Sequence, residues 1–213
     1  MKELKNYLIV MFAFMMLGVG CALTLKGGIG VAAWDALAQT GYDLFHIKAG
    51  TISIILNCSC VLGELLILRK DFKFTHLLQV PCSILLGGVV NIVLYDILSY
   101  IQVEHYLMNM GLFIIGTIWN AFFVALMMHM DVVTTALEGL CMATTRILPF
   151  KFHQIRQAVD VFIVVTIIIV SFTFHIPSSV REGTVISMLI FGPLLGVFMN
   201  KIKNISLAIQ QDL

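Results

Sequence analysis

The sequence predicts an all-α membrane protein with six transmembrane helices, arranged as two inverted three-helix repeats, and three observations support this prediction. Hydrophobic residues make up 60% of the 213 and charged residues 12%, whereas an ordinary soluble domain has roughly 25% charged residues. Six apolar stretches approach the roughly 20 residues that a helix needs to cross a bilayer. The third observation is a similarity between the two halves of the chain. The predicted spans are residues 7–24, 50–68, 77–95, 107–128, 157–174 and 185–199.

The first span follows Lys2 and Lys5 and is similar in pattern to a signal peptide. Its apolar run is longer than the roughly 7–15 residues of a signal peptide, and no small-residue cleavage site follows it. We therefore expect this segment to remain in the protein as a transmembrane helix.

Three glycines, Gly27, Gly28 and Gly30, follow the first span. They resemble part of a dinucleotide-binding fingerprint, but that fingerprint needs a preceding strand and an acidic residue about 20 positions further along. Because the preceding segment is a predicted membrane span, we reject a nucleotide site. Glycine adopts backbone conformations that residues with a Cβ avoid, so we expect these glycines to form a sharp elbow.

A segment of about 15 residues separates the first two spans of each half, at 31–45 and 132–148. In the first segment Asp35, Gln39 and Asp43 recur every four residues, which places them on one face of a helix. Each segment is too short and too polar to cross a bilayer alone. We expect two short amphipathic helices that lie in the membrane interface or dip into the protein.

Small and polar residues follow one face of the second span at heptad spacing. They are Gly50, Ser53, Asn57, Cys60 and Glu64. Such a seam predicts close packing against other helices. Glu64 lies close to Arg69 in sequence, and we expect its carboxylate at the membrane interface.

The fifth span begins with a second polar stripe, at i, i+3, i+4 and i+7. Its members are His153, Arg156, Gln157 and Asp160. Ionisable groups inside a span are costly and are functional candidates by default. A structural interpretation is also open, in which Arg156 extends toward the membrane surface and pairs with Asp160 one turn along.

A shift of 103 residues superimposes the two halves without gaps from about residue 22 to about residue 61. Asp35 then corresponds to Glu138, and Asn57 corresponds to Asp160. Residues 1–103 and 104–213 are therefore predicted to be two repeats within one membrane domain. Because each repeat has three spans, the second enters the membrane from the opposite side, as in many secondary transporters.

The third span of each half carries the same short pattern, Leu-Leu-Gly-x-x-x-Asn, at 85–91 and 194–200. Small residues let helix backbones approach one another in a membrane. We expect close helix contacts at Gly87, Gly88 and Gly196.

Basic residues are distributed unevenly between the predicted loops. With the N-terminus in the cytoplasm, ten of the 13 Lys and Arg residues lie on the cytoplasmic side, and only Lys26, Lys48 and Arg181 lie outside. Cytoplasmic loops are enriched in Lys and Arg. The sequence therefore predicts that both termini are cytoplasmic.

The order of these elements resembles one family of bacterial proteins over nearly the whole chain. The residues that carry the resemblance are Gly30, Trp34, Asp35 and Leu37, in the pattern Gly-x-x-x-Trp-Asp-x-Leu, and Gly50-Thr51 at the start of the second span. This pattern is similar to the YczE/YyaS/YitT family of bacterial integral membrane proteins. Members often carry Pro before Trp-Asp, where this chain has Ala33. The resemblance implies the bacterial cytoplasmic membrane and names no substrate.

The two repeats are predicted to bring polar groups together near the middle of the membrane. The candidate substrate-binding residues are Asp35, Asn57, Glu138, Arg156 and Asp160. We expect a small secondary transporter or permease for a small solute or ion. The alternative is a non-transporting accessory protein that assists or regulates a partner, such as an exporter or a membrane-associated synthesis system.

Other classes of function lack support in the sequence. No spacing of Ser, His, Asp or Cys matches an enzyme or metal motif, so we expect no catalytic residue, metal or cofactor. A net charge of +1 without a basic patch excludes nucleic-acid binding. The expected partners are the lipid bilayer, a small solute or ion, and a second copy of the chain in a homodimer.

Overall fold

The structure is a computed structural model that describes residues 2–101, 105–130 and 132–211. Over these ranges the regular structure is helical, and six helical segments are long and apolar enough to cross a membrane. These findings confirm the predicted all-α class and the six predicted spans of a multi-pass membrane protein. The predicted boundary at 103/104 lies outside the described residues. The spans are Asn6–Gly27, Ala49–Asp71, Phe74–Tyr100, Tyr106–Met130, Phe152–Phe174 and Glu182–Ile205.

Five of the spans extend beyond the predicted apolar run at both ends, and the fifth, Phe152–Phe174, extends only at its start. The third span contains four consecutive helical pieces, which pass from α-helix into a π-helical and then a 3-10 segment. The elements are α1 (Lys2–Gly27), α2 (Ala33–Phe45), α3 (Ala49–Leu68), η1 (Arg69–Asp71), α4 (Phe74–Leu77), α5 (Gln79–Asn91), η2 (Ile92–Ile97), η3 (Leu98–Tyr100), α6 (Tyr106–Met130), α7 (Ala136–Thr144), α8 (Phe152–Phe174) and α9 (Glu182–Gln211).

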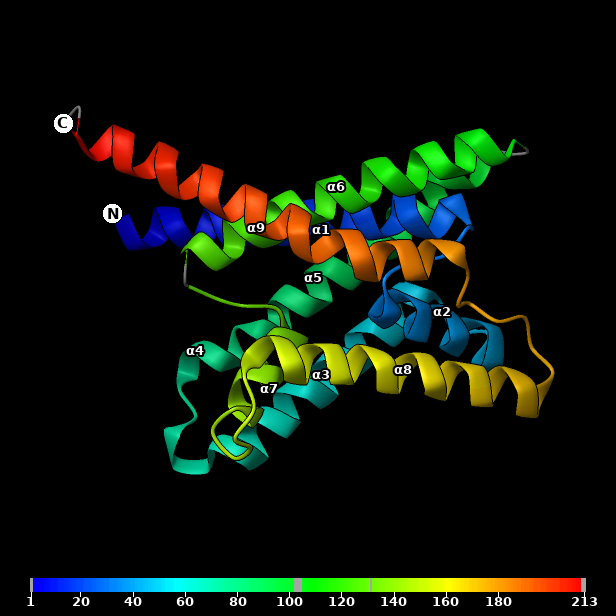
Figure 1. Cartoon of the computed structure of the whole chain (residues 1–213), viewed down its shortest axis with the longest axis horizontal. Helices are drawn as coiled ribbons and strands as arrows, with labels where there is room; N and C mark the ends of the chain where they lie inside the picture. Colours follow the sequence, from blue (N-terminus) through cyan, green and yellow to red (C-terminus); the bar gives the residue numbers. More distant parts are fainter. Residues whose placement is uncertain (1, 102–104, 131, 212–213) are drawn as a thin grey trace.

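The long helices run roughly along one direction, and the chain passes back and forth along it (Figure 1). Helix α1 packs along α6, with α5 against α1 and α9 against α6. The short helix α2 packs against α3 and α8, and the short helix α7 also packs against α3 and α8. Buried side chains between α1 and α6, including Phe14, Leu17 and Met127, form part of the apolar core.

The elbow after α1 has the backbone expected of its glycines. Gly28 and Gly30 have φ angles of 63° and 120°, values that residues with a Cβ rarely adopt. Gly27 is the last residue of α1, and a Cβ there would lie 2.9 Å from the backbone oxygen of Asn109 on α6. The amide of Gly183 donates a 2.8 Å hydrogen bond to the carbonyl of Ile29, which joins the elbow to the start of α9.

The second short helix is much shorter than the predicted segment 132–148. Helix α7 begins at Ala136 and ends at Thr144. The hydroxyl of Thr144 donates to the carbonyl of Leu140 in the last turn, and Pro149 follows shortly afterwards. The residue before a proline avoids the α conformation, so the chain leaves the helix early.

The two short helices lie toward opposite ends of the molecule. Helix α7 is near the end that holds both termini and α4, and α2 is toward the other end (Figure 1). The connection from α8 to α9 also lies at the end away from the termini (Figure 1). This arrangement agrees with an even number of passes through a membrane.

The glycines of the third spans differ in their surroundings. A Cβ on Gly87 would meet the carbonyl of Gly50 and lie 2.5 Å from Ile54, so this glycine allows close contact between α3 and α5, as predicted. For Gly88 and Gly196 the prediction was wrong, because a Cβ at either position would have no atom within 4 Å. The two glycines therefore face open space beside their helices.

The topology predicts where inserted reporters will be found. We expect a reporter fused after Lys203 and one inserted within 101–106 to lie on opposite sides of the membrane, because three spans, the fourth to the sixth, separate the two sites. Alkaline phosphatase and green fluorescent protein fusions measure this directly. Activity of the same reporter at both sites would contradict the six-span arrangement.

Candidate functional site

Four charged side chains gather between the short helices and α8, and we call them the central charged cluster: Asp35, Glu138, Arg156 and Asp160. Arg156 donates from Nε to Glu138 Oε1 at 3.3 Å and also donates to the carboxylate of Asp160. The three side chains of this ion-paired group are only 21–24% exposed. One guanidinium on a membrane span therefore holds two carboxylates that come from different helices.

The local sequence explains how these groups reach one another. Glu138 lies in the first turn of α7, where a negative charge is favoured by the helix dipole. Arg156 and Asp160 lie one turn apart on α8, the spacing at which helical side chains face each other. Because α7 packs against α8, its first turn brings Glu138 to the guanidinium.

Asp35 joins the cluster from the first half of the chain. It lies in the first turn of α2, half-buried, with the Cys21 thiol as a hydrogen-bond partner. Burial raises the pKa of Asp35 to about 6, although the hydrogen bond with Cys21 and the charge of Arg156 favour the ionised form. A carboxyl group with this pKa exchanges protons near neutral pH.

The polar stripe predicted on the fifth span is only partly inside the protein. Arg156 and Asp160 face the interior, but His153 and Gln157 are exposed, so the prediction of one continuous stripe was wrong. The inward face of α8 is set by an apolar row that includes Ile155, Ile163 and Ile167.

The seam predicted on the second span is confirmed. Gly50, Ser53, Asn57, Cys60 and Glu64 are all buried on α3. Within the described ranges, the side chain of Asn57 makes no hydrogen bond to the central charged cluster, and its part in the site stays a prediction. Cys60, one turn further along, packs against α7 and Ile155 of α8.

Unsatisfied polar atoms surround the cluster. The indole Nε1 of Trp34 and the hydroxyl of Thr135 are buried without a hydrogen-bond partner. A cavity of about 20 Å³ is lined by Thr134, Thr135 and Glu138 together with five apolar side chains, which is room for about one water molecule or a small ion. Buried polar groups are normally paired, so we expect this cavity to be occupied.

The raised pKa of Asp35 predicts a pH-dependent effect of Asp35→Asn. Above about pH 6 the ionised, half-buried carboxylate lowers stability, and protonation removes this cost as the pH falls through that pKa. We expect Asp35→Asn to raise the melting temperature at about pH 7.5 and to have a smaller effect at about pH 5. Thermal unfolding in detergent at both pH values checks this, and an equal loss of stability at both would contradict it.

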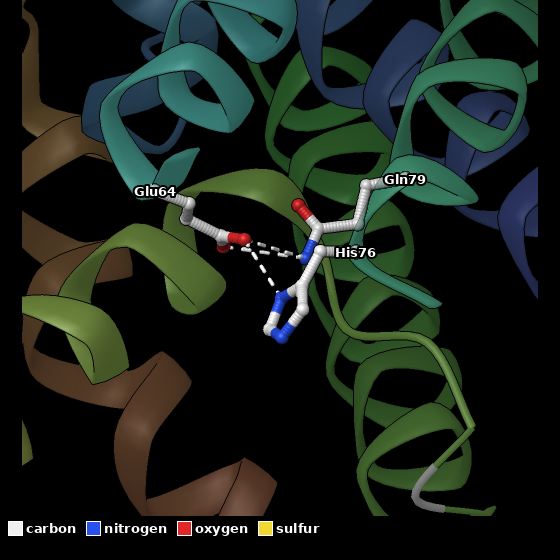
Figure 2. A network of polar contacts seen from close by, with 3 residues as sticks. All are labelled: Glu64, His76 and Gln79. Atoms are coloured by element: carbon white, nitrogen blue, oxygen red, sulfur yellow. Dashed lines mark hydrogen bonds and ion pairs between the residues drawn. The ribbon is translucent and has the colours of Figure 1, made fainter. Parts of the chain in front are cut away.

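The sequence did not predict which residues contact Glu64. Glu64 is fully buried inside the protein, and its position at the level of the membrane interface stays a prediction. Its carboxylate accepts hydrogen bonds from Gln79 Nε2 at 3.2 and 3.3 Å and lies 2.9 Å from Nδ1 of His76 (Figure 2). The seam on α3 signalled that Glu64 faces inward, but nothing in the sequence indicated which residues of the third span would meet it.

Fold and site together define a multi-pass membrane protein with charged groups buried between its helices. A family model described as a family of unknown function, DUF6198, matches residues 4–200, and the chain belongs to this family. No curated protein and no solved structure matches the chain. Among the described residues, no group of three or more His, Cys, Asp and Glu side chains is placed to hold a metal ion.

Proposed function

We propose that this protein is a small secondary transporter for a small cation, with the central charged cluster as its binding site. The observation that carries the proposal is the sharing of Arg156 by Glu138 and Asp160 inside a membrane span, with Asp35 close by from the other half of the chain. Ionisable groups in this position are costly and mark ion or substrate pathways in membrane proteins. We propose transport and assign no catalytic role to the cluster.

The composition of the cluster favours a positively charged substrate. Three carboxylates face one guanidinium, so negative charge exceeds positive charge in the cluster even when Asp35 is protonated, and the excess grows when Asp35 is ionised. A small cation or a protonated amine would neutralise this excess, and an anion would increase it. The cavity of about 20 Å³ beside Glu138 favours an ion over a large solute.

We further propose that the two halves are inverted repeats that rock against each other. The packing is reciprocal, because α2 lies against α8 of the second half and α7 lies against α3 of the first. The carboxylates of Asp35 and Glu138 also occupy the same position, in the first turn of their short helices. In secondary transporters such repeats hold the substrate between interrupted helices near the membrane midplane.

The resemblance to the YczE/YyaS/YitT family and the distribution of basic residues support a location in the bacterial cytoplasmic membrane with both termini cytoplasmic. A non-transporting accessory protein is the second candidate. The small size of the protein, 213 residues, favours it. The two candidates differ in one property: a transporter moves its cation across a sealed membrane.

The proposed site predicts the effect of Asp160→Asn on cation binding. A ligand at about 100 times its Kd stabilises the folded protein by about 2.7 kcal/mol. We therefore expect at least one member of a library of inorganic cations and organic amines to raise the melting temperature of the wild type. Asp160→Asn removes one of the cluster's carboxylates and should abolish that shift.

The exposed neighbour Gln157 on the same helix supplies a matched control, and Gln157→Ala should keep the ligand-induced shift. A shift that persists in Asp160→Asn would place the ligand elsewhere. A library without any stabilising cation would remove the support for a cation site.

A further inference from the structure

The pair formed by Glu64 and His76 lies apart from the central charged cluster and has a different composition. Glu64 on α3 has 0% exposed surface, and its partners come from the start of the third span. His76 lies on α4 and Gln79 begins α5. The network therefore joins α3, α4 and α5 around one buried carboxylate (Figure 2).

Charge balance requires a proton in this network. A bare carboxylate away from water is strongly disfavoured unless a positive charge or a proton compensates it. Gln79 is neutral, so among the described partners of Glu64 only His76 brings a titratable group. The pair is neutral overall when it holds one proton, either on the carboxyl group or as an imidazolium beside a carboxylate.

The other charged groups near Glu64 do not compensate the negative charge of its carboxylate. On α7, Glu138 pairs with Arg156. Lys73 and Arg146 line the adjoining pocket, and Arg146 contacts Asp71. Cys60 is a titratable group one turn before Glu64 on the same helix. As a thiol it is uncharged, so it does not compensate the charge of the carboxylate.

A pocket gives the pair access to water. It has a volume of about 440 Å³ and lies between α4, the start of α5 and α7, with His76, Gln79 and Gly139 among its lining residues. The side chain of His76 is 28% exposed, whereas that of Glu64 is not exposed. In Figure 2, Nδ1 of His76 faces Glu64 and Nε2 lies on the far side of the ring. The imidazole therefore stands between the buried carboxylate and the pocket.

Two further features indicate a polar site at Glu64 and His76. The Oε1 atom of Gln79 is buried without a hydrogen-bond partner, although the residue lines the pocket. That oxygen is free to accept a hydrogen bond from a water molecule beside the pair. Gly139 on α7 lacks the Cβ that would collide with Oε1 of Glu64 and lie 2.8 Å from Gln79 Nε2.

We propose that Glu64 and His76 form a proton-binding site that exchanges its proton with water in the pocket between α4, α5 and α7. In the transfer, a hydronium ion in the pocket gives a proton to Nε2 of His76 and becomes water, so an O–H bond breaks and an N–H bond forms. The N–H bond at Nδ1 breaks as its proton passes to Oε2 of Glu64, where an O–H bond forms, and the ring changes from the tautomer protonated at Nδ1 to the one protonated at Nε2. The reverse transfer returns the proton to water. The site does not depend on the proposed transport.

Infrared spectroscopy of the purified protein in lipid tests this site without any transport assay. The wild type should show the carbonyl-stretch band of a protonated carboxylic acid at a pH at which the protein is folded, and Glu64→Gln should remove it. After transfer to D₂O the band should shift quickly. His76→Asn keeps an amide N–H that can donate to Glu64 but has no second nitrogen for relay, so we expect exchange to slow by about tenfold or more.

Lys73→Gln supplies the control, because it alters the charge at the pocket and leaves the His76 ring in place. Its exchange rate should match the wild type. If Glu64→Gln removes no band at any pH at which the protein is folded, Glu64 does not bind a proton. If His76→Asn exchanges as fast as the wild type, the proton does not pass through His76. Either result would overturn the proposal and leave the proposed transport untouched.

Discussion

Arg156→Met is expected to be the most damaging single substitution in the central charged cluster. It leaves the carboxylates of Glu138 and Asp160 in a largely buried place without their shared cation. Removing one partner of a buried ion pair costs several kcal/mol. Because these side chains keep some exposure, we expect a loss of about 2 kcal/mol in the free energy of unfolding, measured by thermal or denaturant unfolding in detergent.

The cause of this loss is tested by neutralising the two carboxylates as well. The triple variant Arg156→Met, Glu138→Gln, Asp160→Asn removes both carboxylates that pair with Arg156 and should recover most of the stability. His153→Ala, on the exposed side of the same helix, should stay close to the wild type. A triple variant as unstable as Arg156→Met would show that the guanidinium acts through packing and not through its ion pairs.

Gly87→Ala is expected to disrupt the contact between α3 and α5. The added Cβ would meet the backbone carbonyl of Gly50 and lie 2.5 Å from Ile54. A backbone atom cannot move aside without separating the helices, and overpacking of this kind costs up to about 3 kcal/mol. We expect a matching fall in the melting temperature and in the yield of folded protein.

The next residue provides a matched control for Gly87→Ala. A Cβ on Gly88 would have no atom within 4 Å, and alanine favours the helix by up to about 1 kcal/mol over glycine. Gly88→Ala should therefore leave the stability unchanged or raise it. Equal losses at the two positions would contradict the helix packing described here.

The sequence predicted the elements of the fold better than their contacts. Hydropathy and length identified all six spans, because crossing a bilayer requires a long apolar run whatever the tertiary structure. The glycine elbow was predictable because positive φ angles favour glycine, as at Gly28 and Gly30. The early end of α7 depends on Thr144 and the following proline, and hydrophobic pattern alone does not register such local signals.

The contacts of the third spans were harder to predict for a physical reason. Gly87 and Gly196 occupy the same place in a shared pattern, yet only Gly87 faces another helix closely. Asn91 likewise accepts a hydrogen bond from the amide of Gly50, whereas Asn200 is exposed. A sequence pattern shows which residues are small, but the rotation of each helix decides whether a neighbour is present.

The candidate site was predictable to the extent that helical spacing determines it. The i, i+4 spacing on α8 indicated that Arg156 and Asp160 meet, and the correspondence between the halves singled out Asp35 and Glu138. The ion pair between Glu138 and Arg156 was not predictable in this way, because it depends on how α7 packs against α8. The Glu64 network was missed because His76 and Gln79 reach Glu64 only through the turn between α3 and α5, whose geometry the sequence does not specify.

The measurement that tests the central claim most directly is cation uptake into sealed vesicles that contain the purified protein. The cation that stabilises the wild type is supplied outside, with and without a proton gradient. The account predicts time-dependent, saturable uptake above that of empty vesicles, and its loss in Asp160→Asn although that variant is folded and inserted. Wild-type protein that is folded, inserted and bound to the cation, yet moves none under any gradient, would contradict transport and favour the accessory function.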